Sequence, residues 1–248
     1  MGQLQDKVAI ITGSNTGIGK GIAEVFAKEG AKVVINGRRK ELIDSVAAQI
    51  KADGGESLAV PADVTKEKDV LALFEKTIAT WGKVDILVNN AGVATHTPTW
   101  EMSLAQWQSV IDINLTAAFL CSREAFKFMK DHGGGRIINI GSISAQTPRT
   151  HAAPYTATKM AMEGLARSLT LDGRPFNIVS SVIHPGPTAS NFNAARGGPG
   201  KGKTPADFIM FPHDIGRLAT LMCSLPEEVN LFSAIILPNH MPSFIGRG

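Results

Sequence analysis

The sequence predicts an α/β fold: a single domain with a doubly wound parallel sheet of seven strands and helices on both faces. Short apolar runs alternate with longer segments of helical period, which is typical of parallel strands joined by crossover helices. The runs are rich in β-branched residues and apolar on both faces, as strands buried between two layers of helices are. The length, 248 residues, suits one domain of this class.

Seven runs carry the strand pattern, and the first of them leads directly into a glycine-rich turn. The expected strands are, in chain order, Val8–Ile11, Lys32–Ile35, Ser57–Val60, Ile86–Val88, Arg136–Ile140, Asn177–Ile183 and Ser233–Leu237. Between them, segments of helical period predict the helices. These are Gly17–Glu29, Lys40–Ala52, Glu67–Trp81, Leu104–Lys130, Pro154–Leu171 and His213–Ser224. No linker, internal repeat or low-complexity tract divides the chain.

One segment, Ala194–Thr204, breaks the alternation because it is rich in glycine and lysine and has no periodicity. It follows the sixth expected strand and precedes the last helix. Such a stretch is either a mobile lid or a plain flexible insertion. We expect a flexible substrate lid near residues 187–212.

Charge and cysteine content exclude several classes of protein. Lys and Arg number 25 against 22 Asp and Glu, and the chain has no dense basic block, so nucleic-acid binding is not expected. The two cysteines, Cys121 and Cys223, cannot build a disulfide framework, which favours a reducing compartment. The start lacks an apolar signal core, and no run approaches the roughly 20 residues that span a bilayer. We expect a soluble cytoplasmic protein without a membrane partner.

The glycine turn after the first strand, Thr12–Gly19, has the spacing G-x-x-x-G-x-G and opens a helix. Glycines let the backbone approach a pyrophosphate, and the helix N-terminus supplies free N–H groups and a positive dipole end. The alternative is a purely structural strand-to-helix corner. The expected dinucleotide contacts in this turn are Gly13, Ser14, Thr16, Gly17, Ile18 and Gly19.

The end of the second strand indicates which dinucleotide is bound. No carboxylate stands there to accept a bond from a ribose 2′-hydroxyl, and Arg38 and Arg39 follow. A guanidinium holds a 2′-phosphate in a fork of N–H donors, so we expect NADP(H), with NADPH preferred over NADH. Arg38 is the expected main contact, assisted by Ser14 or Arg39; the alternative is a solvated helix start. Asp63, beside Val64 after the third strand, is placed to bond the adenine amino group, unless it is an ordinary turn carboxylate.

Tyr155 and Lys159 are the residues most suited to acid–base chemistry. They stand four apart in an expected helix, hence one turn apart on one face. A positive charge near a phenol favours phenolate, and a tyrosine shifted in this way is a competent general acid or base. A tyrosine on a helix commonly serves packing, but this one is the only tyrosine of the chain.

Hydroxyl and amide side chains follow the neighbouring strands. Ser142 comes directly after the fifth strand, where a hydroxyl can donate to a substrate carbonyl oxygen. Asn114 lies in a long apolar helix, a position that is unexpected unless its amide bonds main chain or water. Asn89–Gly92, after the fourth strand, supplies a second close-approach glycine, with amides to brace it.

Together these motifs resemble the short-chain dehydrogenase/reductase family, in its classical subfamily, from about residue 5 to residue 190. The residues that carry the resemblance are Thr12–Gly19, Asn89–Gly92, Asn114, Ser142, the pair Tyr155 and Lys159, and Pro185 with Gly186. Two segments depart from the family pattern: Val179-Ser180-Ser181 in the sixth strand and Pro238-Asn239-His240 after the last. The second bears on the C-terminal contacts and the subunit interface.

The resemblance implies a Rossmann-type fold and hydride transfer between a nicotinamide and a ketone or 3-oxo compound. Tyr155 would protonate the carbonyl oxygen, Ser142 would hold it, and Lys159 would depress the Tyr155 pKa and position the cofactor. Asn114 would hold a water of the proton relay. The further cofactor contacts that the family implies are Asn90, Ala91, Gly92, Pro185, Gly186 and Thr188 or Ser190. The substrate pocket that it implies includes Val93, Ser144, His151 and Phe192.

Three further expectations complete the sequence-based hypothesis. Family members commonly pair through the helices that carry Asn114 and Tyr155, so a homotetramer or dimer is expected. None of the six histidines stands at a metal-ligand spacing, so no catalytic metal is expected. The alternatives to a carbonyl reductase are a dinucleotide-binding sensor or scaffold without turnover, and dehydratase, epimerase or enoyl reductase chemistry on the same fold.

Overall fold

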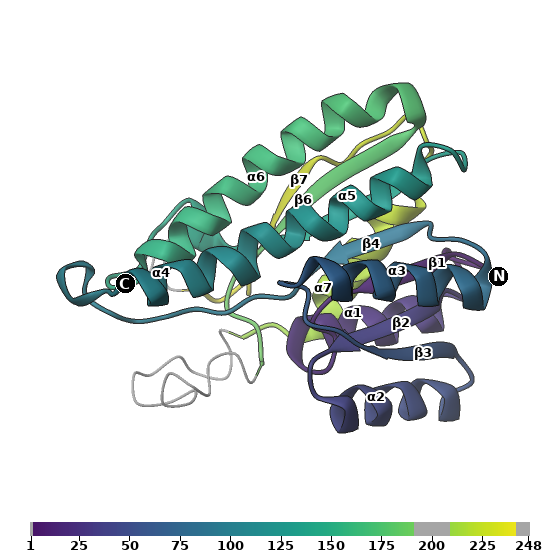
Figure 1. Cartoon of the computed structure of the whole chain (residues 1–248), viewed down its shortest axis with the longest axis horizontal. Coiled ribbons are helices and arrows are strands. Elements are labelled where there is room, and N and C mark those ends of the chain that lie inside the picture. Colours follow the sequence, from purple (N-terminus) through teal and green to yellow (C-terminus); the bar gives the residue numbers. More distant parts are fainter. Residues whose placement is uncertain (1, 191–208, 242–248) are drawn as a thin grey trace.

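The seven strands form one sheet in the order β3-β2-β1-β4-β5-β6-β7, with every neighbouring pair parallel (Figure 1). The computed structural model describes residues 2–190 and 209–241. The strands are β1 Val8–Ile11, β2 Lys32–Gly37, β3 Glu56–Pro61, β4 Ile86–Asn89, β5 Gly135–Ile140, β6 Ile178–Pro185 and β7 Ser233–Ile236. The predicted parallel sheet is therefore confirmed, with strand ends within two residues of those expected from the sequence.

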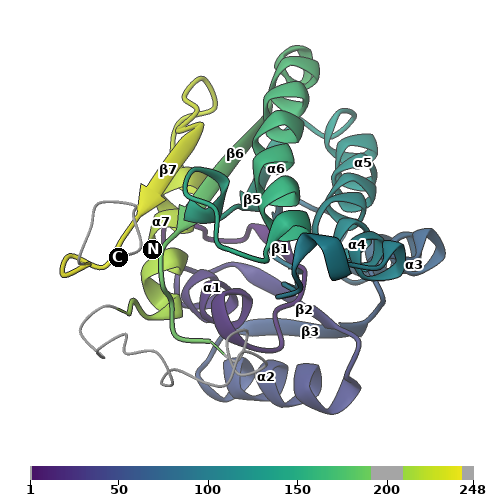
Figure 2. The same cartoon turned by 90° about the vertical axis from the view of Figure 1, so that its left-hand side faces the viewer.

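Helices cover both faces of the sheet (Figure 2). They are α1 Gly17–Lys28, α2 Lys40–Ala52, α3 Glu67–Trp81, α4 Leu104–Ile111, α5 Ala117–Met129, α6 Ala153–Gly173 and α7 Pro212–Ser224. The strand β1 shows why its run is apolar throughout. Ala9 and Ile11 pack into the core under α1, α2 and α7, whereas Ile10 packs into the core under α3 and α5. The expected doubly wound, single-domain fold is confirmed.

The long helix expected over Leu104–Lys130 is present from Leu104 to Met129, but it is not α-helical throughout. A π-helical turn, η2 (Asp112–Thr116), separates α4 from α5 and contains Asn114. The Asn114 side chain is fully buried and bonds the main chain of Val93, outside the helix. A single wide turn inside an α-helix is typical of functional sites, because it redirects one side chain without ending the helix.

The sheet order also locates the place where a ligand can bind. β1 lies between β2 and β4, so the chain winds outward from β1 in both directions. The loops after β1 and β4 therefore leave the sheet towards opposite faces and open a crevice at the carboxyl ends of the strands.

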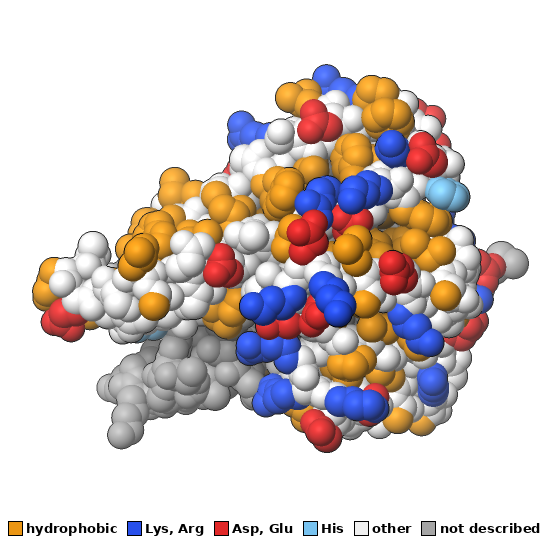
Figure 3. Space-filling view, viewed as in Figure 1, with side chains coloured by type: hydrophobic (Ala, Val, Ile, Leu, Met, Phe, Trp, Pro, Cys, Tyr) orange, Lys and Arg blue, Asp and Glu red, His pale blue; other side chains and the backbone are white. Residues whose placement is uncertain are grey.

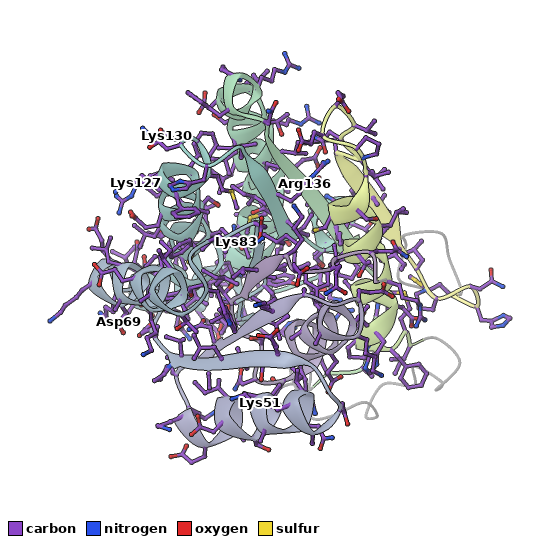
Figure 4. The ribbon with its side chains drawn as sticks, turned by 90° about the vertical axis from the view of Figure 1, so that its right-hand side faces the viewer. Lys51, Asp69, Lys83, Lys127, Lys130 and Arg136 are labelled. Carbon is purple, nitrogen blue, oxygen red and sulfur yellow. The ribbon has the colours of Figure 1, made fainter. Side chains whose placement is uncertain are left out.

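Arg136, at the amino end of β5, ties that strand to the segment after α7 (Figure 4). Its guanidinium, in a side chain only 8% exposed, donates to the main-chain carbonyls of Val229, Leu225 and Pro226 at 2.9, 2.8 and 2.7 Å. Methionine would keep an apolar stem but remove all three donors. We expect Arg136→Met to lower the free energy of unfolding by about 2–4 kcal/mol, measured by urea denaturation.

Lys51→Met is the matched control, because Lys51 is an exposed cation on α2. We expect it to change the free energy of unfolding by less than about 0.5 kcal/mol. Equal effects of the two substitutions would show that the three bonds of Arg136 do not stabilise the fold.

Candidate active site

A cavity of about 750 Å³ lies at the carboxyl ends of the strands, where the sheet order places the crevice. Its wall combines the turn after β1, the ends of β2 and β3, the loop after β4, and the segments after β5 and β6. Twenty of the residues singled out in the sequence line it together. They are Gly13, Thr16, Gly17, Ile18, Arg38, Arg39, Asp63, Val64, Asn90, Ala91, Gly92, Val93, Ser142, Ser144, Tyr155, Lys159, Pro185, Gly186, Thr188 and Ser190.

The glycine turn is clamped to the loop after β4. Gly13 adopts a left-handed backbone with φ 62°, and a Cβ on it would lie 2.9 Å from the Cα of Ala91. The amide of Asn90 donates to the carbonyls of Thr12 and Gly13 at 2.8 and 3.1 Å. A Cβ on Gly19 would lie 2.3 Å from that same amide nitrogen, so glycine at this position makes room for Asn90.

The N-terminus of α1 meets the chemical requirements of a pyrophosphate. Thr16 is the N-cap, but its side chain caps no N–H group, and the first turn carries no acidic side chain. Neither an N-cap side chain nor an acidic side chain of the first turn therefore binds these N–H groups or offsets the positive dipole end. With glycines at 13 and 17 forming the cradle, the residues present fit a dinucleotide phosphate.

Ser14 does not belong to the cavity wall that the described residues build, although a contact with the dinucleotide was expected there. It is fully buried, and its hydroxyl donates to the Ile11 carbonyl at 2.7 Å and accepts from the Asn36 N–H at 3.0 Å. Asn36 in turn donates to the carbonyls of Val60 and Ala62. Asn36 was not predicted from the sequence; its buried side-chain amide joins β2 to β3 beneath the turn.

Two cations stand at the end of β2, and a carboxylate stands across from them after β3. Arg38, Arg39 and Asp63 all line the cavity. Burial opposes the ionisation of Asp63, but the hydrogen bonds from Thr65 and the charges of Arg38 and Lys66 outweigh it, so its pKa lies below the ordinary value. Asp63 is therefore an anion that accepts two bonds from Thr65 at 3.1 and 2.8 Å, as an ordinary turn carboxylate does.

Lys159 is buried beneath the ring of Tyr155. Its ammonium lies 5.7 Å from the ring centroid and donates to the carbonyl of Ile140, the last residue of β5, at 2.6 Å. Burial lowers the pKa of Lys159 to about 8 from its ordinary 10.5. The expected helical pairing is thus present, and the ammonium is held in place from the sheet side.

Ser142 is 6% exposed and caps the short 3-10 helix η3 (Ile143–Ala145). Its hydroxyl oxygen accepts the Ser144 N–H at 3.1 Å. A hydroxyl that already accepts a bond has its own proton left to donate, and accepting polarises that proton. Ser142 therefore offers a donor to a ligand oxygen in the cavity.

Asn114 braces the loop after β4. Its Oδ1 accepts the Val93 N–H at 2.8 Å, and its Nδ2 donates to the Val93 carbonyl at 2.9 Å and to the Thr158 hydroxyl at 3.1 Å. Thr158 donates to the carbonyl of Tyr155 at 2.9 Å. The expected bonding of this amide to main chain is present, and it links the loop after β4 to the helix of Tyr155.

The part of the cavity that is expected to hold the substrate differs in part from the pocket that the family resemblance implies. His151 is exposed, and its ring packs edge-on against Trp100 instead of joining the wall built by the described residues. Phe192, like most of the expected lid, lies outside the described residues, while the two ends of the lid meet in a bridge between Thr188 and Met210. Three residues that were not predicted from the sequence also line the cavity: Asn15, Ile113 and Arg149. The only sequence signal for Asn15 and Ile113 is their place next to recognised motif residues, and Arg149 has only its place in a loop between Ser142 and Tyr155.

The thiols do not offer a nucleophile. Burial raises the pKa of Cys121 and of Cys223 to about 12. Within residues 2–190 and 209–241, no three side chains of His, Cys, Asp or Glu gather as a metal site. In the same part of the chain, no helix has the length and apolar character needed to span a bilayer.

The amino-acid sequence is similar to known proteins. The model of the short chain dehydrogenase family matches residues 7–198. A 3-oxoacyl-[acyl-carrier-protein] reductase of Synechocystis is 37% identical over 187 residues, which are 75% of this chain and 76% of that protein.

Solved structures resemble nearly the whole chain. A putative gluconate dehydrogenase from Agrobacterium tumefaciens matches with a TM-score of 0.89 at 32% identity, over 97% of this chain and 98% of that one. A 7α-hydroxysteroid dehydrogenase complexed with NADH and 7-oxo glycochenodeoxycholic acid matches with a TM-score of 0.88 at 31% identity, over 95% and 94%.

Proposed function

Because the chain belongs to the short-chain dehydrogenase family of oxidoreductases, we propose that it is an NADP(H)-dependent carbonyl reductase acting on a ketone or 3-oxo compound. The observation that carries the proposal is the common cavity of Ser142, Tyr155 and Lys159, beside a glycine turn that fits a dinucleotide phosphate. When bound, the nicotinamide would supply or accept the hydride. The proton transfer and the stabilisation of the carbonyl oxygen are carried out by residues of this chain.

Each side chain has a distinct role in this proposal. The Tyr155 hydroxyl gives a proton to the carbonyl oxygen, or takes one from the alcohol in the reverse direction. Ser142 donates a hydrogen bond to the same oxygen and stabilises the charge that develops on it. Lys159, held on the Ile140 carbonyl, favours the phenolate of Tyr155 and reaches the nicotinamide ribose. Asn114 holds the loop at Val93, beside the water that the family relay implies.

Arg38 supports the preference for NADPH. It lines the cavity beyond β2, where no carboxylate follows the strand to accept bonds from a ribose 2′-hydroxyl. We expect Arg38→Ala to weaken NADPH binding by at least about tenfold and NADH binding by less than about twofold, because only NADPH carries the 2′-phosphate. Fluorescence titration of the reduced nicotinamides measures both constants. Equal weakening of NADPH and NADH binding would contradict the role of Arg38 in the preference for NADPH.

The substrate class is inferred from the reacting half of the cavity and from the relatives. The 3-oxoacyl-[acyl-carrier-protein] reductase supports a 3-oxo compound, and the hydroxysteroid dehydrogenase structure holds a ketone that is also an acid. Arg149, in the loop after η3, lines the cavity and adds a positive charge to its wall. A ketone that carries an anionic group is therefore the first substrate to try.

The deciding experiment follows the absorbance of NADPH and of NADH against a panel of ketones and 3-oxo compounds, each neutral member paired with a carboxylate analogue. The variant Tyr155→Phe serves as the blank. Turnover with NADPH that vanishes in the variant would support the reductase. Tight NADPH binding without turnover would favour a dinucleotide-binding sensor or scaffold. Products other than the alcohol would indicate a dehydratase, an epimerase or an enoyl reductase.

We also infer a homo-oligomer, a tetramer or a dimer, formed through α4, α5 and α6. Figure 3 shows hydrophobic side chains gathered over these helices on one face of the molecule. Large apolar residues that are exposed there include Leu104, Phe119, Met160 and Leu171. An apolar face of this kind is typical of a protein–protein contact. Light scattering that finds only monomers would overturn the inference.

A further inference from the structure

His184 lies behind the loop that carries Ser142, and none of the roles proposed above uses it. It stands near the end of β6 and is fully buried. Its ring nitrogen Nδ1 lies 3.1 Å from the carbonyl oxygen of Ser142 and 3.4 Å from the main-chain nitrogen of the same residue. A buried imidazole therefore touches the main chain of the residue whose hydroxyl is to hold the substrate.

The ring stands where the strand ladder ends. The pairing of β5 with β6 runs to Ile140 and Ile183, and the Gly141 N–H still donates to the Ile183 carbonyl at 2.7 Å. At Ser142, one residue after Gly141, the neighbour is the ring of His184 instead of the main chain of β6. Gly141 makes room for it, because a Cβ there would lie 2.7 Å from Nδ1.

The Ser142 carbonyl is fixed from two sides. It accepts the Ala145 N–H at 3.0 Å, which closes the turn η3, and it faces Nδ1 of His184 at 3.1 Å. A carbonyl oxygen has two lone pairs, and the second accepts from His184 in the tautomer that carries its proton on Nδ1. The distances favour this tautomer, because Nδ1 lies closer to the Ser142 oxygen (3.1 Å) than to the Ser142 nitrogen (3.4 Å). The bond from Nδ1–H is therefore the one that ties the turn to the sheet.

The opposite ring nitrogen faces a carboxylate. Nε2 of His184 is buried and lies 3.7 Å from Oε2 of Glu163 on α6. The other oxygen of Glu163 accepts from Arg167 at 2.6 Å, which holds the carboxylate in place. Glu163 stands one helical turn after Lys159 and two after Tyr155. His184 thus lies between the helix of the acid–base pair and the main chain of Ser142.

We propose that His184 is a positioning residue, whose ring between Glu163 and the Ser142 main chain fixes the direction in which the Ser142 hydroxyl meets the substrate carbonyl oxygen. The proposal rests on the role of Ser142 given under the proposed function. The Ser142 hydroxyl is anchored within its own turn by the Ser144 N–H, so its direction depends on where that turn sits. A displacement of about 1 Å at a reacting centre can cost about 100-fold in rate.

Two substitutions test the contact through its chemistry. Asparagine can place an amide N–H close to the position of Nδ1, whereas leucine fills the space without a donor. We expect His184→Leu to lower kcat by at least about tenfold with the NADPH dissociation constant within about twofold of wild type, and His184→Asn to recover most of the loss. Unchanged kcat in His184→Leu would overturn the proposal.

His213→Leu is the matched control. His213 on α7 also faces a glutamate, Glu24, at 2.8 Å, but it lies outside the cavity wall of the described residues. Its substitution should leave kcat unchanged. If His184→Leu fails to fold, His184→Gln replaces it, because glutamine places its amide near Nε2 and not near Nδ1. The expected order of kcat is then asparagine above glutamine, and equal values would contradict the proposal.

Hydrogen exchange of residues 141–146, followed in the cofactor-free protein, separates this proposal from the proposed function. We expect these amides to exchange at least about tenfold faster in His184→Leu than in wild type or His184→Asn. Equal exchange would overturn the positioning role even if wild type turned over no ketone. Conversely, a Ser142→Ala variant with full turnover would overturn the role of Ser142 and with it the catalytic purpose of His184.

Discussion

Tyr155→Phe is expected to lower kcat by at least about 10³-fold, because it removes the only proton donor proposed for the carbonyl oxygen. The substitution keeps the ring that packs over Lys159 and deletes a single hydroxyl. NADPH binding should stay within about twofold of wild type, since the cradle at the glycine turn is untouched. The rate of NADPH oxidation with the best ketone of the panel measures the effect.

The control for this variant is its melting temperature with and without NADPH. An unchanged cofactor-induced stabilisation shows that the fold and the dinucleotide site survive. Residual turnover above a tenth of wild type, with that stabilisation intact, would rule out Tyr155 as the general acid.

Lys159→Met should abolish turnover and at the same time stabilise the cofactor-free protein. The ammonium is buried, and burial lowers its pKa to about 8 from 10.5. Below pH 8 the folded protein therefore holds a charge that the unfolded chain would solvate at lower cost, on the order of 3 kcal/mol. Methionine removes this cost and also the bond to Ile140, so we expect a net gain of about 1–2 kcal/mol in the free energy of unfolding at pH 7.

The sign of the pH dependence follows from the same shift. Between about pH 8 and 10.5 the unfolded chain binds more protons at this lysine than the folded protein does, so the contribution of Lys159 to stability rises with pH in that window. The variant lacks the group and should lose this rise. Denaturant unfolding of both proteins at pH 7 and pH 9.5 measures the difference, and parallel pH profiles would contradict the burial argument.

The single tyrosine gives the same variant a second readout. Because the chain contains one tyrosine, the ultraviolet absorbance of tyrosinate reports on Tyr155 alone. Lys159 keeps its positive charge up to about pH 8, so its removal should move the part of the phenol titration that lies below this pH to higher pH. A titration that does not move would leave Lys159 a role in cofactor binding only.

The sequence by itself determined the elements of the sheet and the local motifs, because these depend on neighbours along the chain. The apolar runs with buried residues on both faces place β1 to β7 within two residues. The glycine spacing after β1 predicts the turn, in which Gly13 is left-handed, and the spacing of Tyr155 and Lys159 places both on one side of α6. Each of these signals is contained in fewer than about ten residues.

Contacts between distant segments were decided only by the tertiary structure. Asn36 joins the turn after β1 to β3, and Asn114 leaves the helical pattern through a π turn because Val93, 21 residues away, accepts and donates to its amide. His184 meets Ser142 across 42 residues because β6 pairs beside β5. Helical or strand period specifies which face a residue occupies, but not what lies opposite it. That depends on the sheet order, which brings segments together that no local pattern connects.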